Sequence, residues 1–249
     1  MHRRGRTCDI APDDAEGQLS ARGLGVLALG DSITNGGGEL QWGVALQSWA
    51  LWLARGLAMP YTGHAIDGAT IRTVLDVQVP RHEALHAPGP YDVGCLYIGV
   101  NDVREPDWDP AAFAAGHAQA LRWLAQHCMR TLAVTIPLRL GRPLAAAKVQ
   151  EANAVVERDA RAEGTLLLDL RDFGARNHVM ADRVHPTAFG QIAMAERALD
   201  VLAADGLPPR LRPHTLISYE TTRWKRLRGD VTYLYRSAKD AAAARVRVR

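Results

Sequence analysis

Short apolar runs alternate with longer amphipathic stretches along most of this chain. Five runs have the length of strands, and they cover residues 24–30, 61–66, 92–100, 131–136 and 165–170. Stretches with helical spacing of apolar residues follow them, at residues 43–59, 73–86, 111–128, 144–162 and 186–204. This alternation predicts an α/β fold of three layers, with a five-stranded parallel sheet covered by helices on both faces. Five strands of this kind favour a flavodoxin-like order over two nucleotide-binding halves.

Pro80 and Pro186 affect the predicted helix boundaries. Pro80 falls inside the second helical stretch and could break it. Pro186 stands at the start of the last stretch, and proline is suited to the first turn of a helix.

The first apolar run ends in an unusual sequence of small and polar residues. After Leu29 the chain continues as Gly30-Asp31-Ser32, and three glycines follow at 36–38. Gly30 permits a sharp turn, and in an open α/β sheet the loop leaving the carboxyl end of a central strand is where ligands bind. Ser32 is therefore a candidate nucleophile, and the alternative is that it only caps the following helix.

The composition is that of an ordinary globular protein, but its charge is unevenly distributed. Of 249 residues, 47% are hydrophobic and 23% are charged, and the formal net charge is +3. Residues 210–249 hold 11 Lys and Arg against 3 Asp and Glu, a charge of +8, whereas residues 1–209 carry −5. We therefore predict a flexible arm at 1–22, one α/β domain at 23–207 and a basic extension at 208–249.

The cysteines and the apolar runs bear on the cellular compartment in which the protein is expected. Cys8, Cys95 and Cys128 are odd in number and have no C-x-x-C spacing, which favours neither a disulfide framework nor a zinc site. Cys95 lies in an apolar run and is predicted to be a core residue. The basic start leads into no apolar signal core, and no apolar stretch reaches the roughly 18 residues that a membrane span requires. We expect a cytoplasmic location.

Polar groups at other predicted strand ends, and before the last helix, complete the parts of an acyl-transfer site. His185 could take the proton of Ser32, and Asp182, three residues before it, could hold the other ring nitrogen. The tetrahedral intermediate needs fixed donors for its oxyanion. The backbone N–H groups of Ser32 and Gly68 and the side-chain amide of Asn101 could supply them.

Together these motifs resemble the sequence blocks of the SGNH hydrolases, the superfamily of GDSL-type esterases and lipases. The matching blocks are Gly30-Asp31-Ser32, Ile66-Asp67-Gly68, Gly99-Val100-Asn101-Asp102 and Asp182-Arg183-Val184-His185. The resemblance covers about residues 24–204 and implies the same five-stranded fold. It makes Ser32 the nucleophile, Asp182 and His185 the rest of the triad, and Gly68 and Asn101 oxyanion donors. Family members often carry Asn and then Gly ahead of the second block's glycine, where this chain has Gly63 and Ala65.

The predicted activity is therefore that of a serine hydrolase, without metal or cofactor, acting on a small-molecule carboxylic ester through an acyl-serine. The same site could serve an acyltransferase or a thioesterase, and the fold does not choose among esters. A two-metal phosphoesterase is the less favoured alternative, because Ile33 and Asp102 stand where such an enzyme needs histidines. We expect Asp31 to orient the nucleophile loop and Asp102 to cap the turn before Pro106.

Other aromatic and glycine residues have weaker assignments. Trp49 and Trp52 are predicted core residues, whereas Trp42 and Trp108 could line a substrate pocket, with the glycines at 36–38 as a flexible wall.

The basic extension has aromatic residues among its arginines, as an interfacial segment does. Trp224, Tyr233 and Tyr235 lie near the cluster at 223–228, and residues 230–249 could form a basic helix. An anionic membrane surface is thus a candidate partner, and nucleic acid is a less favoured one. The interpretation that we favour is a solvated arm or a helix packed on the body. The sequence does not indicate an oligomeric state.

Overall fold

A parallel sheet of five strands lies at the centre of the computed structural model, which describes residues 23–85, 89–141 and 145–247. In spatial order the strands are β2 (Tyr61–Gly63), β1 (Val26–Gly30), β3 (Tyr91–Tyr97), β4 (Cys128–Val134) and β5 (Leu166–Leu168). All neighbouring pairs are parallel. The predicted α/β class and flavodoxin-like order are confirmed. The arm predicted at 1–22 and Cys8 lie outside the described residues.

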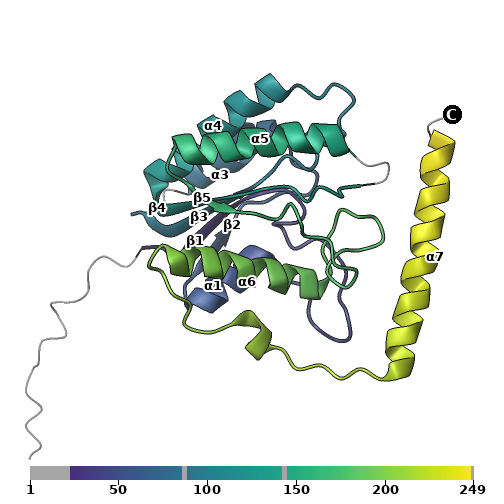
Figure 1. Ribbon diagram of the computed structural model, residues 1–249. Coiled ribbons are helices and arrows are strands. Elements are labelled where there is room, and N and C mark those ends of the chain that lie inside the picture. The colour runs from purple at the N-terminus through teal and green to yellow at the C-terminus, as the bar shows by residue number, and fades with distance from the viewer. Residues whose placement is uncertain (1–22, 86–88, 142–144, 248–249) are drawn as a thin grey trace, which may run out of the picture.

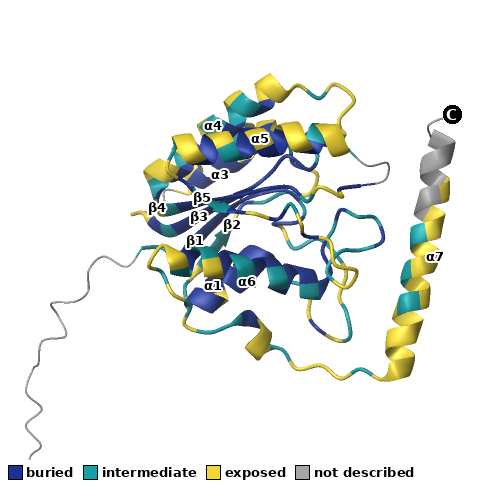
Figure 2. Cartoon of the chain, viewed as in Figure 1, coloured by how far each residue is buried: buried dark blue, intermediate teal, exposed yellow. Residues whose placement is uncertain are grey.

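Helices cover both faces of the sheet (Figure 1). One face carries α1 (Trp49–Leu57) and α6 (Ala188–Ala204). The other carries α4 (Pro110–His127), α5 (Ala146–Ala162) and a helical segment made of α2 (Ile71–Thr73), the π-helical η2 (Val74–Gln78) and α3 (Val79–Ala84). Figure 2 shows the buried residues concentrated along the sheet and on the helix faces turned toward it. This double cover explains why the central strands are continuous apolar runs.

The first strands and helices hold the core residues that the sequence predicts. Every residue of β1 is buried, and Cys95 on the neighbouring β3 is fully buried. Trp49 and Trp52 on α1 are 0% and 3% exposed, as predicted for core residues.

Helix α1 begins at Trp49, six residues later than the predicted start at Gly43. Gly43 has a positive φ of 83°, and Val44 donates its N–H to the carbonyl of Gln41, so this segment forms a turn. The hydroxyl of Ser48 then caps the helix by accepting the N–H of Ala50. The apolar periodicity of residues 43–48 reflects packing of a loop and not a helix.

Pro80 and Pro186 lie at positions relative to the helix boundaries that differ from the predicted ones. Pro80 does not break its helix, because it stands in the first turn of α3, where the missing N–H costs nothing, after the π-helical turns of η2. Pro186 lies before α6 and not in its first turn. The N-cap of α6 is Thr187, whose hydroxyl accepts the N–H of Gly190.

Beyond α6 the chain stays in contact with the body before it forms a last helix. The 3-10 helix η4 (Pro213–Leu216) lies against α1 and α6, and Arg212 pairs with Glu196 and Asp200 of α6. Helix α7 (Arg223–Arg247) then stands beside the loops at the carboxyl ends of the strands (Figure 1). A helix was expected in this region, and it begins seven residues before the predicted Asp230.

Candidate active site

Ser32 lies in a sharp turn directly after the central strand β1. Gly30 has a φ of 153°, and a side chain there would collide with the carbonyl oxygen of Tyr97 on β3. The turn after Ser32 closes when the N–H of Gly37 donates to its carbonyl at 2.6 Å. Glycine at position 30 therefore lets the strand turn immediately and brings Ser32 to the carboxyl edge of the sheet.

The structure brings Ser32, His185 and Asp182 into one hydrogen-bonded chain. Ser32 Oγ lies 3.0 Å from His185 Nε2, and His185 Nδ1 lies 2.8 Å from Asp182 Oδ2. Asp182 Oδ1 accepts the backbone N–H groups of Val184 and His185 at 2.9 and 3.1 Å. This turn, with Arg183 at a positive φ of 60°, fixes the carboxylate against the imidazole three residues later.

The electrostatics of this pair favour a charged imidazole. The hydrogen bond to Asp182 raises the pKa of His185 above its usual value of 6.5, although partial burial opposes the shift. Burial also opposes the charge of Asp182, but hydrogen bonds from the His185 ring and from two backbone N–H groups hold its pKa below the usual 3.8. The pair can accept a proton from Ser32 and stabilise the imidazolium that results.

Each of the three predicted oxyanion donors has an N–H that makes no hydrogen bond within the described part of the chain. Among the described residues, the backbone N–H groups of Ser32 and Gly68 have no acceptor within the chain. Gly68 is exposed with a φ of 75°, and open space surrounds the position of a Cβ. Asn101 donates one side-chain N–H to the carbonyl of Ala69 at 2.9 Å, which ties its amide to the loop of Gly68 and leaves its second hydrogen free. These groups can bind a developing oxyanion.

The two supporting aspartates bind backbone N–H groups at the base of the site. Asp31 is fully buried, and its Oδ1 accepts the N–H of Ile33 at 2.9 Å. This bond orients the turn of residues 30–37, which we call the nucleophile turn because it carries the candidate nucleophile Ser32. Asp102 Oδ1 accepts the N–H of Ile71 at 2.9 Å. The expectation that Asp102 caps the turn before Pro106 is thus wrong for its side chain, which reaches the start of α2 and links it to the segment that follows β3.

Burial disfavours the charged form of both aspartates. It raises the pKa of Asp31 to about 7 and that of Asp102 to about 6. In each residue the Oδ2 atom is buried without a partner in the described part of the chain. Both carboxyl groups therefore gain a proton more easily than an exposed aspartate.

Two buried glutamines that the sequence reasoning missed hold the nucleophile turn from both sides. Gln78 of η2 accepts the N–H of Gly30 at 2.9 Å and donates to its carbonyl at 2.8 Å. Gln191 of α6 donates to the carbonyls of Ile33 and Gly37, both at 3.0 Å, and accepts the N–H of Trp49. Both side chains are fully buried. Each glutamine has two apolar residues on at least one side at a distance of one helical turn, and this was the signal that could have found them.

The two tryptophans proposed as pocket walls have different surroundings. Trp108 packs on Phe113 and donates to Glu151 at 2.8 Å. Trp42 stacks on Tyr219, with ring centroids 6.0 Å apart, and it also lines a cavity of about 640 Å³ between residues 39–42 and α7. The glycine loop is held by Gln191 at Gly37, so it forms a fixed part of the nucleophile turn.

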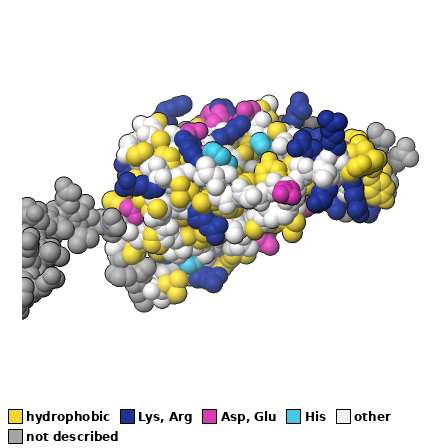
Figure 3. Space-filling model, turned by 90° about the horizontal axis from the view of Figure 1, so that it is seen from below, with side chains coloured by type: hydrophobic (Ala, Val, Ile, Leu, Met, Phe, Trp, Pro, Cys, Tyr) yellow, Lys and Arg dark blue, Asp and Glu magenta, His cyan; other side chains and the backbone are white. Residues whose placement is uncertain are grey.

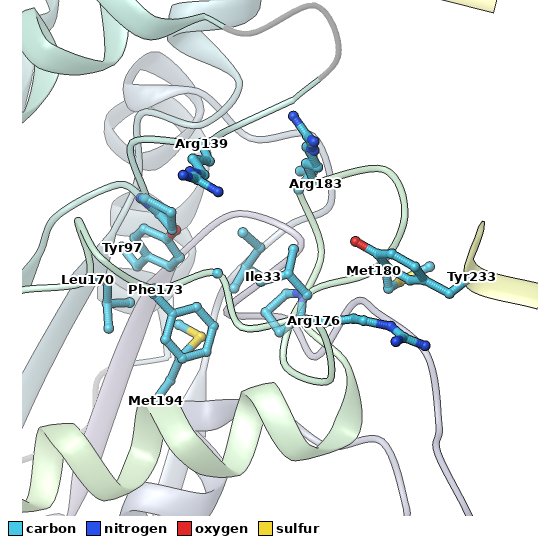
Figure 4. Close-up of a pocket in the computed structure, with 15 residues that line it drawn as sticks. Ile33, Tyr97, Arg139, Leu170, Phe173, Arg176, Met180, Arg183, Met194 and Tyr233 are labelled. Atoms are coloured by element: carbon cyan, nitrogen blue, oxygen red, sulfur yellow. The ribbon is translucent and has the colours of Figure 1, made fainter. Parts of the chain in front are cut away.

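A cavity of about 170 Å³ lies beside the triad (Figure 4). Phe173 and Met194 lie together at one end of it, and the guanidinium groups of Arg139 and Arg183 lie at another. Ile33 and Val184, the chain neighbours of the triad residues, line it, whereas Ser32 and His185 do not. The cavity therefore lies next to Ser32 and His185 without including them in its lining, and we assign no substrate group to it.

The carboxylates considered as metal ligands are not arranged as a ligand set. Within the described ranges, no group of three or more His, Cys, Asp or Glu side chains could hold a metal ion. The first carboxylate oxygens of Asp31 and Asp102 are directed to backbone N–H groups of Ile33 and Ile71 instead.

Comparison with solved structures shows the same fold. The acetylxylan esterase Axe2 of Geobacillus stearothermophilus, in a catalytic serine-to-alanine mutant, matches with a TM-score of 0.59 at 20% identity over 73% of this chain and 94% of its own. LAE5, an alpha/beta hydrolase from the metagenome of Lake Arreo in Spain, matches with a TM-score of 0.58 at 21% identity over 74% of this chain and 96% of its own. Mutants of Axe2 with an aspartate or a histidine replaced by alanine, also described as catalytic, match too.

A search of curated proteins returns no match. The model of the GDSL-like Lipase/Acylhydrolase family matches residues 28–192, which include the nucleophile turn and extend into α6. This chain therefore belongs to the GDSL-like lipase/acylhydrolase family and is an ester hydrolase.

Proposed function

We propose that this ester hydrolase cleaves a carboxylic ester through an acyl intermediate on Ser32. His185 takes the proton of the Ser32 hydroxyl while its oxygen attacks the acyl carbonyl. The oxyanion is held by the backbone N–H groups of Ser32 and Gly68 and by the amide of Asn101. His185 then protonates the leaving alcohol, and a water molecule repeats the cycle on the acyl-serine. Asp182 keeps the imidazole oriented and stabilises its charged form.

The observation that carries this proposal is the continuous chain from Ser32 to Asp182. Both links, at 3.0 and 2.8 Å, have hydrogen-bond length, although the serine and the histidine are 153 residues apart in sequence. In the acetylxylan esterase Axe2 a serine, an aspartate and a histidine are the residues of the catalytic mutants. The free N–H groups at Ser32, Gly68 and Asn101 support the same mechanism, because a site without acceptors for them needs an oxyanion or water.

The substrate class that we propose is a small carboxylic ester with a short acyl group. The support is twofold: a structural neighbour is an acetylxylan esterase, and Ser32 is not among the residues that line the cavity of Figure 4. p-Nitrophenyl acetate is therefore the first substrate to assay, followed by longer acyl esters and by thioesters.

Replacement of Ser32 by alanine tests the proposal. We expect Ser32→Ala to lower kcat on p-nitrophenyl acetate by about 10⁴-fold or more, because the nucleophile is removed. Ser218→Ala is the matched control, since Ser218 is exposed and lies in an irregular segment. Wild-type rates in Ser32→Ala would overturn the mechanism. A loss of wild-type activity in EDTA that is restored by a divalent metal would favour the phosphoesterase alternative.

A further inference from the structure

Helix α7 carries a stripe of uncovered hydrophobic side chains. Five of the twelve large hydrophobic side chains that are exposed in the described part of the chain belong to this one helix. They are Trp224, Leu227, Val231, Leu234 and Tyr235, which are 79%, 51%, 58%, 62% and 69% exposed. At 3.6 residues per turn these positions fall within an arc of about 100°. Such an arc is the apolar face of an amphipathic helix.

Polar contacts, made mostly from the other side of α7, attach the helix to the body. Asp230 forms an ion pair with Arg176, whose guanidinium also lies over the ring of Tyr233 at 5.4 Å. Arg236 pairs with Glu39 at 2.8 Å. Tyr233 and Arg236 project from the side of the helix that faces away from the stripe, and Asp230 lies beside the stripe, about 40° from Leu234. Attachment to the body therefore leaves the apolar arc facing away from it.

Basic side chains border the stripe. The segment Arg223–Arg247 contains eight Lys and Arg residues and two Asp residues, a formal charge of +6. Lys225, Arg228 and Lys239 follow the apolar arc on one side of the helix, and within the described ranges they form no ion pair. Figure 3 shows hydrophobic side chains gathered at the α7 end of the molecule with Lys and Arg side chains beside them.

We propose that the outer face of α7 binds an anionic lipid surface, with the helix lying in the plane of the interface. An apolar arc containing Trp, Leu and Val next to Lys and Arg fits the boundary between acyl chains and negatively charged headgroups. Trp224 and Tyr235 are residue types that concentrate at this boundary. Among residues 23–85, 89–141 and 145–247, none of the helices has the length and apolar character of a membrane span.

The composition of the arc distinguishes lipid from other partners. A nucleic acid would face Leu227, Val231 and Leu234, which offer no contact to phosphates, at the centre of the surface. A second copy of the same helix would bring two strongly positive segments together, and their charges repel. An anionic bilayer complements both the apolar centre and the basic border.

Helix α7 contacts the two loops that carry the candidate catalytic residues, so binding of α7 to lipid also positions these loops. Arg236 is fastened to Glu39, seven residues after the Ser32 nucleophile, and Asp230 is fastened to Arg176, six residues before Asp182. A bound α7 therefore holds both site-bearing loops next to the lipid surface.

Vesicle sedimentation of the full chain tests the proposal without any measurement of activity. We expect binding to vesicles of phosphatidylcholine with about 30 mol % phosphatidylserine, and much weaker binding to pure phosphatidylcholine. Combined Leu227→Ser, Val231→Ser and Leu234→Ser should weaken binding at least tenfold, because the apolar insertion is lost. The matched control is Val77→Ser, Leu85→Ser and Met129→Ser, whose residues are 46%, 63% and 51% exposed on the body.

Charge is tested separately. Combined Lys225→Glu, Arg228→Glu and Lys239→Glu should weaken binding by about a hundredfold or more, since each basic group near an anionic surface strengthens binding about fivefold. Arg72→Glu with Arg161→Glu, both exposed on the body, should change it little. Circular dichroism of each variant checks that the body is folded. Equal binding by the α7 and control variants, or no vesicle binding at all, would overturn the proposal. Self-association or duplex DNA binding in place of vesicle binding would do the same.

Discussion

At the scale of single residues, the account depends on a neutral His185 that is ready to accept a proton. Because the hydrogen bond to Asp182 raises the pKa of His185, the acid limb of kcat/KM should have its midpoint above 6.5, with activity rising with pH through it. Asp182→Asn should move the midpoint to lower pH and should cost less activity than His185→Ala. Asp172→Asn, an exposed carboxylate paired with Arg197, is the control. A midpoint unaffected by Asp182→Asn would contradict the assigned pair.

The buried carboxyl of Asp31 leads to a prediction about the pH dependence of the free energy of unfolding. Its pKa is about 7 in the folded chain, compared with the usual 3.8 of an aspartate, so the folded state binds more protons between these values. Stability therefore falls as the pH rises from about 4 to about 7. Asp31→Asn removes this loss, and its free energy of unfolding relative to wild type should increase across that window by up to about 4 kcal/mol.

Urea unfolding at several pH values measures this difference. Asp76→Asn on the exposed face of η2 provides the control, and its difference from wild type should be small. A difference for Asp31→Asn that stays constant between pH 4 and 7.5 would show that the buried carboxyl does not titrate in this range.

The sequence selected Ser32, Asp182 and His185, and the structure places these three side chains in hydrogen-bond contact. They could be selected because a serine after the first strand and an aspartate and a histidine before the last helix are the side chains that one acyl-transfer mechanism requires. The side-chain partner of Asp102 could not be predicted, because Ile71 is 31 residues away and only the packing of two loops brings them together.

At the scale of elements, the nucleophile turn depends on two helices that pack on opposite faces of the sheet. Gln78 from η2 binds the N–H and the carbonyl of Gly30 through both ends of its amide. Gln191 from α6 donates to the carbonyls of Ile33 and Gly37, and its amide oxygen accepts the N–H of Trp49 at the start of α1. Burial without these partners would cost free energy, so the glutamines and the turn fix one another. The sequence could place both helices, but it could not show that their glutamines meet at Gly30 and Ile33.

Gln78→Leu tests this positioning. The N–H of Gly30 loses its acceptor, which should cost about 1–3 kcal/mol in unfolding free energy. We expect kcat to fall about tenfold or more with KM little changed, because Ser32 loses its fixed orientation and the binding groups stay. Gln126→Leu, on the exposed face of α4, is the control. Wild-type kcat in a folded Gln78→Leu variant would show that the nucleophile turn keeps its conformation without the hydrogen bonds from Gln78.

Helix and strand limits show the same division between pattern and packing. Apolar spacing located every element of the sheet and its cover, but Ser48 and Thr187 set the starts of α1 and α6 through caps that the pattern does not contain. A cap decides only which of a few neighbouring residues starts the helix. The sequence could therefore predict that each helix exists, but not the residue at which it begins.

At the scale of the whole molecule, the basic extension consists of two parts with different relations to the body. Residues 210–217 lie on α1 and α6, with Arg212 in two ion pairs and Ile217 against the cluster around Trp52. Helix α7 touches the body through a few polar contacts. The predicted boundary at 207 thus separates a packed segment from its domain, and we propose that the hydrolase unit extends to about residue 220.

Two truncations test this boundary. A chain ending at Glu220 should retain the melting temperature and should keep p-nitrophenyl acetate activity within about twofold, because the site residues precede the cut. A chain ending at Leu207 should lose about 1–3 kcal/mol of stability, since the ion pairs of Arg212 and the packing of Ile217 disappear. Equal stability of the two truncated chains would show that residues 208–220 contribute nothing to the body.

The central claim is that Ser32 is the nucleophile, and covalent labelling tests it most directly. A fluorophosphonate ester reacts with an activated serine and leaves a stable phosphonyl adduct, whose position peptide mass spectrometry identifies. The account predicts one adduct, on the peptide that contains Ser32, forming in parallel with loss of esterase activity and absent in Ser32→Ala and His185→Ala. Full inactivation with the adduct on another residue, or retained activity in a chain fully labelled at Ser32, would contradict it.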